Sequence, residues 1–263
     1  MASLYPIPLL RQGGDIDLYV NEIIFEKAVT AIKAVTDNHE DDHYTLKHFG
    51  CKCGDIEIEL HRYSDYLSFR KKKNKHFQKI SNEGLCNTNR SLKLGETEVQ
   101  LPTGHYDCIF ILQHLWNHLI TGGVGFRQVC DWMLTVNRFK GEIDPTVLKL
   151  DLEKCGIYNA WKYLAYISVN YLGLNKDSCP LYDESDTTRK IAEKLLRVIF
   201  EDGNFGKKNG VKNEEGRPDN YIGSKIHSMK NNFRRLRKTV RYVEKEDRLA
   251  YYLEYLRSTT ERL

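Results

Sequence analysis

A pair of acidic residues, one residue apart and directly after a Gly-Gly turn, constrains this chain more than any other feature. They alternate with the apolar residues Ile16, Leu18 and Val20. If this run forms a β-strand, Asp15 and Asp17 project together from the face opposite the apolar residues. Two carboxylates this close repel each other unless they share a proton or a cation lies between them. Mg²⁺ binds one or two carboxylates together with substrate phosphates, so the pattern predicts a metal-dependent site for phosphate chemistry at the edge of a small sheet.

An Asp-x-Asp pair on an exposed strand also arises by chance, so a second acidic run matters. Residues 55–61 alternate strictly between apolar and polar side chains, and the polar face carries Glu57, Glu59 and His61. If this run lies beside the first strand, it brings a third carboxylate to the pair. The sequence leaves open whether Glu57 or Glu59 supplies it.

Composition excludes several classes of protein. With 263 residues, 41% hydrophobic and 29% charged, the chain suits one large globular domain or two small ones. No apolar run approaches the ~20 residues that span a bilayer, and no secretory signal is visible. Seven cysteines without a repeating frame favour reduced thiols. We therefore expect a cytoplasmic protein without a membrane partner, and the net charge of +4 permits a polyanionic ligand without requiring one.

The distribution of periodic patterns predicts an α+β protein with two domains. We expect a small α/β domain over residues 1–102, with a helix at 21–35, strands at 44–53 and 54–63, and one further strand at 91–101. From residue 103 to 263 nearly every segment has helical periodicity, which predicts a helical domain. Residues 202–220 are poor in apolar residues and are expected to form a loop.

Two basic segments have a bland and a functional interpretation. The run Lys71–Lys75 is typical of a solvated helix face, although it could also steer a polyphosphate. A late helix carries many basic residues between Lys225 and Arg241, which could engage a nucleic-acid backbone. Because these charges run nearly round the helix and acidic residues follow, a solvated helix is favoured over a nucleic-acid partner.

Several motifs together carry a resemblance to a known family. They are Tyr5-Pro6, Arg11, Gly14-Asp15-Ile16-Asp17, Glu59-Leu60-His61, and a stretch that begins at His114 and ends in Gly125-Phe126-Arg127-Gln128-Val129-Cys130-Asp131-Trp132. With them, the chain resembles the uncharacterised bacterial nucleotidyltransferase family, within the polymerase-beta-type superfamily, from about residue 4 to about residue 140.

The resemblance implies a small mixed sheet followed by helices, and it implies roles for the acids. Asp15 and Asp17 would hold Mg²⁺, or Mn²⁺, that bridges a nucleoside triphosphate such as ATP. Glu59, or Glu57, would complete a second metal position and help deprotonate an acceptor hydroxyl. Two metals then stabilise the attacking and leaving oxygens. A nucleoside monophosphate would be transferred and pyrophosphate released.

Further residues are candidates for contact with the nucleotide. Arg11 and Gly14 precede the acids directly. Arg127 suits phosphate recognition, but it could equally pair with Asp131 four residues later. His118 lies four residues after His114 on one helix face, where both could bind a ligand or metal, or simply pack within the helical domain.

Members of this superfamily carry a Gly-Ser turn, or Lys-Gly in the narrower family, shortly before the first acid, where backbone amides receive the phosphates. Here 14 residues precede Asp15, with Ser3 as their one serine, so the family's N-terminal helical region is expected to be missing. Two functions follow. The first is transfer of a nucleoside monophosphate to a hydroxyl of a small molecule or protein. The second is a catalytically inactive protein of the same fold that senses nucleotides or binds proteins.

Overall fold

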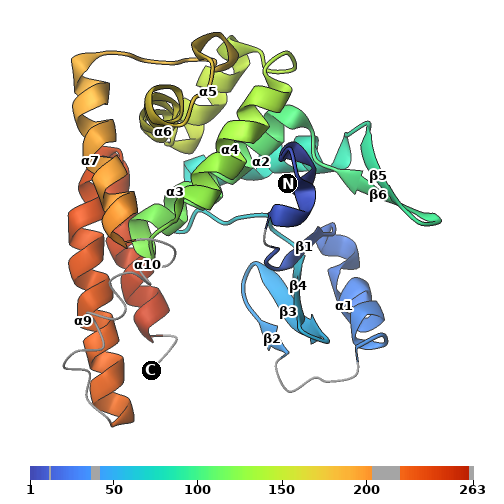
Figure 1. Ribbon diagram of the computed structural model, residues 1–263. Helices are drawn as coiled ribbons and strands as arrows, with labels where there is room; N and C mark the ends of the chain where they lie inside the picture. The colour runs from blue at the N-terminus through green and yellow to red at the C-terminus, as the bar shows by residue number, and fades with distance from the viewer. Residues whose placement is uncertain (12, 37–41, 203–219, 261–263) are drawn as a thin grey trace.

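The computed structural model describes residues 1–11, 13–36, 42–202 and 220–260. A small mixed sheet with a flanking helix lies at one end of the molecule, and helices with one β-hairpin build the remainder (Figure 1). This arrangement confirms the predicted α+β class. Within the described residues, no helix has both the length and the apolar character to cross a bilayer.

The sheet has four strands, and its order sets the position of the site. The strands follow one another as β1 (Ile16–Tyr19), β4 (Ile56–His61), β3 (His48–Cys53) and β2 (His43–Tyr44). β1 pairs with β4 in parallel, whereas the other neighbours are antiparallel. The predicted hairpin turn at Gly54 is present, with a φ of +58° that a residue lacking Cβ adopts at little cost. The two acidic runs of the sequence are therefore adjacent strands.

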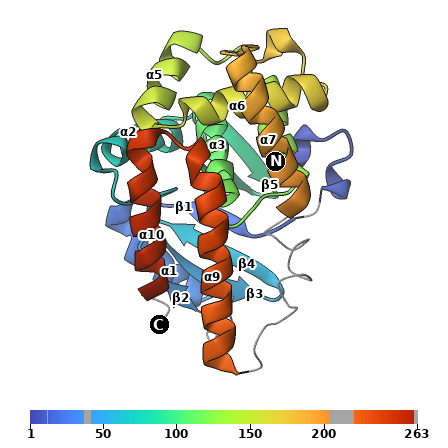
Figure 2. The same ribbon diagram turned by 90° about the vertical axis from the view of Figure 1, so that its left-hand side faces the viewer.

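One face of the sheet is covered by α1 (Phe25–Lys33), which follows β1 after a short 3₁₀ turn (Glu22–Ile24). The side chain of Asn21 accepts a hydrogen bond from the backbone N–H of Ile23, at 2.9 Å, and so caps that turn. The opposite face of the sheet is turned toward α9 and α10 (Figures 1 and 2). Side chains on this second face therefore project toward the helices.

The helical part begins before residue 103. Its helices are α2 (Lys71–Cys86), α3 (Gly104–Thr121), α4 (Phe126–Phe139), α5 (Pro145–Cys155), α6 (Tyr158–Tyr171), α7 (Asp186–Asp202), α9 (Tyr221–Thr239) and α10 (Arg248–Thr260). α3 is its central helix, and Leu112, Trp116 and Leu119 are fully buried there. The predicted loop at 202–220 falls, over residues 203–219, outside the described part of the chain.

The prediction of one strand at 91–101 is wrong. This segment forms a two-stranded antiparallel hairpin, β5 (Arg90–Leu94) and β6 (Thr97–Leu101). Its turn depends on Gly95, which has a φ of +61°. The alternation changes phase at this turn, because Leu92 and Leu94 occupy even positions whereas Val99 and Leu101 occupy odd ones. This change of phase was the signal of the break.

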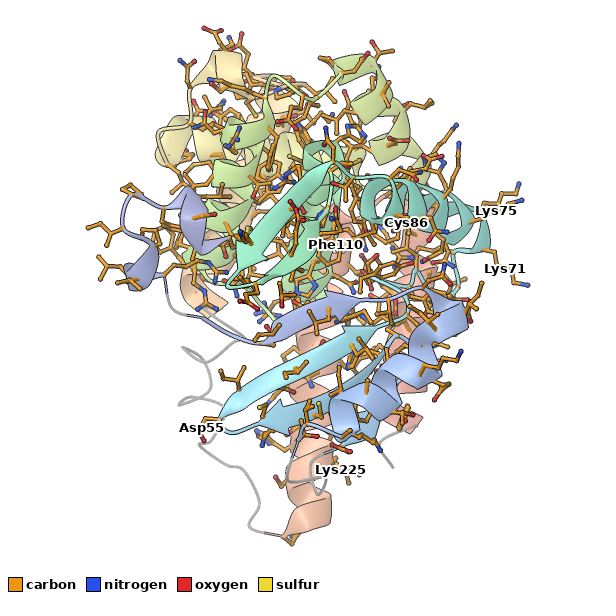
Figure 3. The ribbon with its side chains drawn as sticks, turned by 90° about the vertical axis from the view of Figure 1, so that its right-hand side faces the viewer. Asp55, Lys71, Lys75, Cys86, Phe110 and Lys225 are labelled. Atoms are coloured by element: carbon orange, nitrogen blue, oxygen red, sulfur yellow. The ribbon has the colours of Figure 1, made fainter. Side chains whose placement is uncertain are left out.

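The sheet and the helices each have an apolar cluster of their own. The sheet cluster joins α1 to the strands through Phe25, Val29, Phe49, Cys51 and Leu60. The helical cluster starts at Leu67 and includes residues of α2, so α2 packs with the helices. The clusters thus divide between residues 60 and 67, while a domain boundary near residue 102 stays a prediction. On the outer face of α2, Lys71 and Lys75 point away from the molecule (Figure 3).

Gly84 of α2 offers a test of the packing between α2 and α3. A Cβ added at Gly84 would lie 2.3 Å from Cβ of Tyr106, whereas one added at Gly141 would meet nothing within 4 Å. We expect Gly84→Ala to lower the free energy of unfolding by about 1–3 kcal/mol through overpacking, as measured by urea denaturation. Gly141→Ala is the control and should change it by less than about 0.5 kcal/mol. Equal effects of both substitutions would contradict this close approach.

Candidate active site

The parallel pairing of β1 with β4 brings the predicted acids together. In its register Asp17 lies beside Glu59. Carboxylate oxygens of Asp15, Asp17 and Glu59 all lie within 4.8 Å of one another. Glu57 projects from the same face of β4 but is exposed and, among the described residues, belongs to no such group. The geometry therefore brings Glu59, of the two alternatives, to the aspartate pair.

His61 lies between two of these acids. Its Nε2 is 2.9 Å from Oδ1 of Asp17 and 3.1 Å from Oε2 of Glu59, and its Nδ1 is 3.3 Å from the carbonyl oxygen of Tyr63. Burial lowers the pKa of His61, but the hydrogen bonds to Asp17 and Glu59 outweigh it and raise this pKa to about 9. His61 is thus a cation at neutral pH that offsets part of the charge of the acid cluster. The hydrogen bond from His61 in turn lowers the pKa of Glu59.

His48 is a member of the site that the sequence analysis missed. Antiparallel pairing of β3 and β4 places His48 opposite His61, and its Nε2 lies 3.6 Å from Oε1 of Glu59. Burial lowers the pKa of His48 to about 4, so its imidazole is neutral at pH 7 and able to act as a ligand. The signal was available, because a hairpin that turns at Gly54 sets this register. The group His48, Glu59 and His61 also offers ligand atoms within 4.8 Å of one another.

Two histidines of α3 face the acid cluster from the helical side. Their ring centroids are 4.5 Å apart, and His114 lies within electrostatic reach of Asp17 and Asp15, as His118 does of Glu59. His114 is open to solvent, but the surrounding atoms reduce its hydration and lower its pKa. For His118, burial lowers the pKa to about 4. Both imidazoles are therefore neutral hydrogen-bonding groups near the acids. Although they pack within the helical part, they remain close enough to the acids to belong to the site.

An ion pair next to these histidines joins the loop before β3 to the segment between β4 and α2. Nζ of Lys47 donates to Oδ1 of Asp65 at 3.1 Å, and Asp65 is almost wholly buried. Lys47 also lies within electrostatic reach of Glu59. The charge of Lys47 is balanced by Asp65. Lys47 therefore lies near the acid cluster without neutralising the carboxylates of the cluster.

The candidate ligand residue Arg11 is bound to another part of the chain. Its Nε and Nη2 donate to the two carboxylate oxygens of Asp131, at 3.0 and 2.9 Å. The hydroxyl of Tyr5 donates to Oδ1 of the same carboxylate at 2.8 Å. Arg11 also lies within electrostatic reach of Asp15. The segment before β1 is therefore fastened to α4, and the role of Arg11 toward phosphate stays a prediction.

Gly14 and Arg127 are the remaining candidates for contact with a nucleotide, and each lies three or four residues from a partner in this attachment, Arg11 or Asp131. The space beside the Cα of Gly14 is open, since an added Cβ would meet nothing within 4 Å. Arg127 lies in the first turn of α4, which follows Gly125; the N–H of Gly125 donates to the side chain of Gln128 at 3.0 Å. The partly exposed Arg127 is one turn from Asp131, and its contact with a nucleotide stays a prediction.

The donor set of the cluster suits a divalent metal. Three carboxylates from two strands, with Asp17 57% exposed and Glu59 20% exposed at their side chains, combine access with a defined geometry. Oxygen donors of this kind are preferred by Mg²⁺ and Mn²⁺. The neighbouring imidazole of His48 adds a nitrogen donor that Mg²⁺ does not need. The residues present therefore fit a hard divalent cation at Asp15, Asp17 and Glu59.

Comparison with known proteins agrees with this geometry. A family model described as uncharacterised nucleotidyltransferase matches residues 1–173, which include the sheet, the β5–β6 hairpin and helices α1 to α6. The chain belongs to this nucleotidyltransferase family. Neither the curated proteins nor the solved structures gave a significant match.

The cation of His61 predicts a pH dependence of stability in the metal-free protein. Its pKa is raised from 6.5 to about 9 on folding, so its stabilising effect is complete below pH 6.5 and is lost as the pH rises through 9. We expect the free energy of unfolding, measured with urea in the presence of EDTA, to fall by an amount on the order of 2 kcal/mol over this range.

The His61→Gln variant is the comparison for this measurement. It cannot titrate here, so its stability should change less with pH over the same interval. A variant whose pH profile parallels that of the wild type would show that His61 is not the group responsible.

Proposed function

We propose that this protein transfers a nucleoside monophosphate from a nucleoside triphosphate to a hydroxyl group of a small molecule or protein, with Mg²⁺ or Mn²⁺ as cofactor. The observation that carries the proposal is the group of carboxylates from Asp15, Asp17 and Glu59, within 4.8 Å of one another on two parallel strands. Family membership supports nucleotidyl transfer as the type of reaction. ATP is the first triphosphate to test.

The reaction requires no covalent bond between the substrate and the protein. The acceptor oxygen forms a bond to the α-phosphorus, and the bond from that phosphorus to the bridging oxygen of the β-phosphate breaks. Pyrophosphate leaves with the electron pair, and the hydroxyl proton passes to a carboxylate of the cluster. When bound at Asp15, Asp17 and Glu59, the divalent metal neutralises the charge that develops on the phosphate oxygens. The protein positions the reactants and supplies a preorganised electrostatic environment.

Residues around the acids have roles that follow from their contacts. His61 holds the carboxylates of Asp17 and Glu59 in a fixed orientation, because its Nε2–H is shared between one oxygen of each, at 2.9 and 3.1 Å. His114 and His118 are positioned to donate hydrogen bonds to phosphate oxygens, because their rings face the cluster from α3. Arg11, held by Asp131, stabilises the strand that carries the two aspartates.

One observation favours the alternative of a protein that binds nucleotides without transferring them. The Nε2–H of His61 already occupies one oxygen of Asp17 and one of Glu59, which are two of the oxygens that a metal would use. Such a protein would bind a triphosphate and release no pyrophosphate. The same experiment separates the two functions.

Substitution of single carboxylates tests the proposal with a matched control. We expect Glu59→Gln and Asp17→Asn each to lower the rate of Mn²⁺- or Mg²⁺-dependent pyrophosphate release by about 100-fold or more, because each removes a charge that stabilises the transition state. Glu57→Gln, on the same face of β4 but outside the cluster, should retain activity within about threefold. Release of labelled pyrophosphate from each of the four triphosphates, with a mixture of cellular hydroxyl compounds as acceptors, is the measurement.

The outcomes are distinct. Triphosphate binding without pyrophosphate release under any condition supports the nucleotide-sensing alternative. Wild-type protein that binds no triphosphate with either metal overturns both. Equal loss of activity in Glu57→Gln and Glu59→Gln would contradict the assignment of Glu59.

A further inference from the structure

A cavity of about 540 Å³ adjoins the acid cluster and has no role in the function proposed above. It lies between the end of β1, the β5–β6 hairpin, α3 and α4, and Asp17 and His61 form part of its lining. Its apolar wall comes from residues of all these elements: Leu18, Val99, Leu101, Phe110, Ile111 and Phe139. Figure 3 shows Phe110 in the interior beside the hairpin. A volume of this size is typical of sites for small organic ligands.

The charges in the cavity lining do not suit a polyanion. Arg90 is its only arginine or lysine among the described residues. Its Nη1 donates to Oδ2 of Asp107 at 2.9 Å, and its guanidinium group lies 4.2 Å from the centre of the Phe139 ring. His61, the other cationic side chain of the lining, is hydrogen-bonded to Asp17. The charged side chains of the lining are therefore paired with one another, and they leave no surplus positive charge for a triphosphate. The remaining polar groups include the hydroxyls of Ser64 and Tyr106, 2.6 Å apart, which are neutral hydrogen-bonding partners.

The side chains that α3 presents near the acid cluster change from apolar to polar along the helix. Phe110 lines the cavity, and one turn later comes His114, with 6.0 Å between the ring centroids. His118 follows after one more turn, and the helix ends at Thr121 beside a second, more polar cavity of about 390 Å³ that includes both Lys225 and Glu254. The acids therefore have an apolar cavity toward one end of α3, and two imidazoles with a more polar cavity toward the other.

Nucleotidyl transfer requires this kind of asymmetry. In an in-line displacement, the attacking oxygen and the leaving pyrophosphate lie on opposite sides of the α-phosphorus. The polyphosphate is better placed toward His114, His118 and the second cavity. The acceptor then approaches from the side of the apolar cavity.

We propose that this cavity binds the acceptor, and that the acceptor is a small, uncharged organic molecule with an apolar body and a hydroxyl group directed at Asp17. The inference rests on the proposed function, whose acceptor it identifies by class. Asp17 is the carboxylate of the cluster that lines the cavity, so an acceptor bound there presents its hydroxyl to the cluster at this residue. The hydroxyl proton passes to a carboxylate of the cluster as the oxygen bonds to the α-phosphorus and pyrophosphate departs. A small molecule is favoured over a protein side chain because the cavity is larger than one side chain fills.

Filling the cavity from two sides tests the proposal. Val99→Trp fills it from the hairpin and Ile111→Trp from α3, so a folding defect in one variant leaves the other. Lys93→Trp is the control, because Lys93 alternates to the face of the hairpin opposite Val99, is exposed and does not line the cavity. The probes are 2-naphthol, a neutral fluorescent molecule with one hydroxyl, and ATP with Mn²⁺. Binding of each is measured separately by equilibrium dialysis.

We expect Val99→Trp and Ile111→Trp to weaken 2-naphthol binding at least tenfold and to leave ATP binding within about twofold, while Lys93→Trp changes neither. Unchanged 2-naphthol affinity in both cavity variants, with normal ATP binding, overturns the acceptor site alone. Loss of ATP binding in these variants would show that the cavity holds the nucleobase and would also overturn it.

Two further results complete the test. A short tyrosine-containing peptide is tested as a competitor of 2-naphthol. If the peptide binds the cavity more tightly than 2-naphthol does, the acceptor is a protein, and the small-molecule class is overturned. If the wild type binds no ATP or other triphosphate with Mn²⁺, the proposed function fails and the acceptor assignment fails with it, whatever 2-naphthol does.

Discussion

Three carboxylates within 4.8 Å of one another repel, and the pairing of β1 with β4 holds them together against this repulsion. The register leaves no freedom, because a shift by one residue would turn Asp17 or Glu59 to the opposite face of the sheet. His61 lowers the cost further by placing a cation between two of the acids. A divalent metal would compete with this proton for the same oxygens, so the metal-free site is already organised for a cation.

The position of β1 depends on contacts that come from far along the chain. Asp131 of α4 binds both Tyr5 and Arg11 and thereby fastens the segment that leads into the two aspartates. These three residues belong to separate motifs in the sequence, and in the fold they form one hydrogen-bonded unit. Lys47 and Asp65 form a second connection on the other side of the site. The sheet has only a small apolar cluster of its own, so such polar connections between its edge and the helices set where the acids lie.

How much of this could be predicted differed between elements. Strands β1 and β4, helix α1, the turn at Gly54 and the helices after residue 103 each have a periodic pattern set by their own neighbours in sequence. Their existence was predictable for that reason. The β5–β6 hairpin was missed although the alternation changes phase around Gly95. His48 was missed although the hairpin turn at Gly54 sets its register opposite His61. The bridging position of His61 and the partners of Asp131 depend on pairing between segments that no local pattern connects.

The sequence by itself determined that two acidic strands exist and that their charged side chains share faces, because side-chain alternation is a property of any extended chain. It also determined the α+β class, through the change of periodicity along the chain. Only the tertiary structure decided that Glu59 joins Asp15 and Asp17, that Arg11 is held by Asp131, and that an apolar cavity opens beside Asp17. These are consequences of strand register and helix packing, in which the burial of apolar side chains across long separations selects one arrangement among many that the local pattern permits.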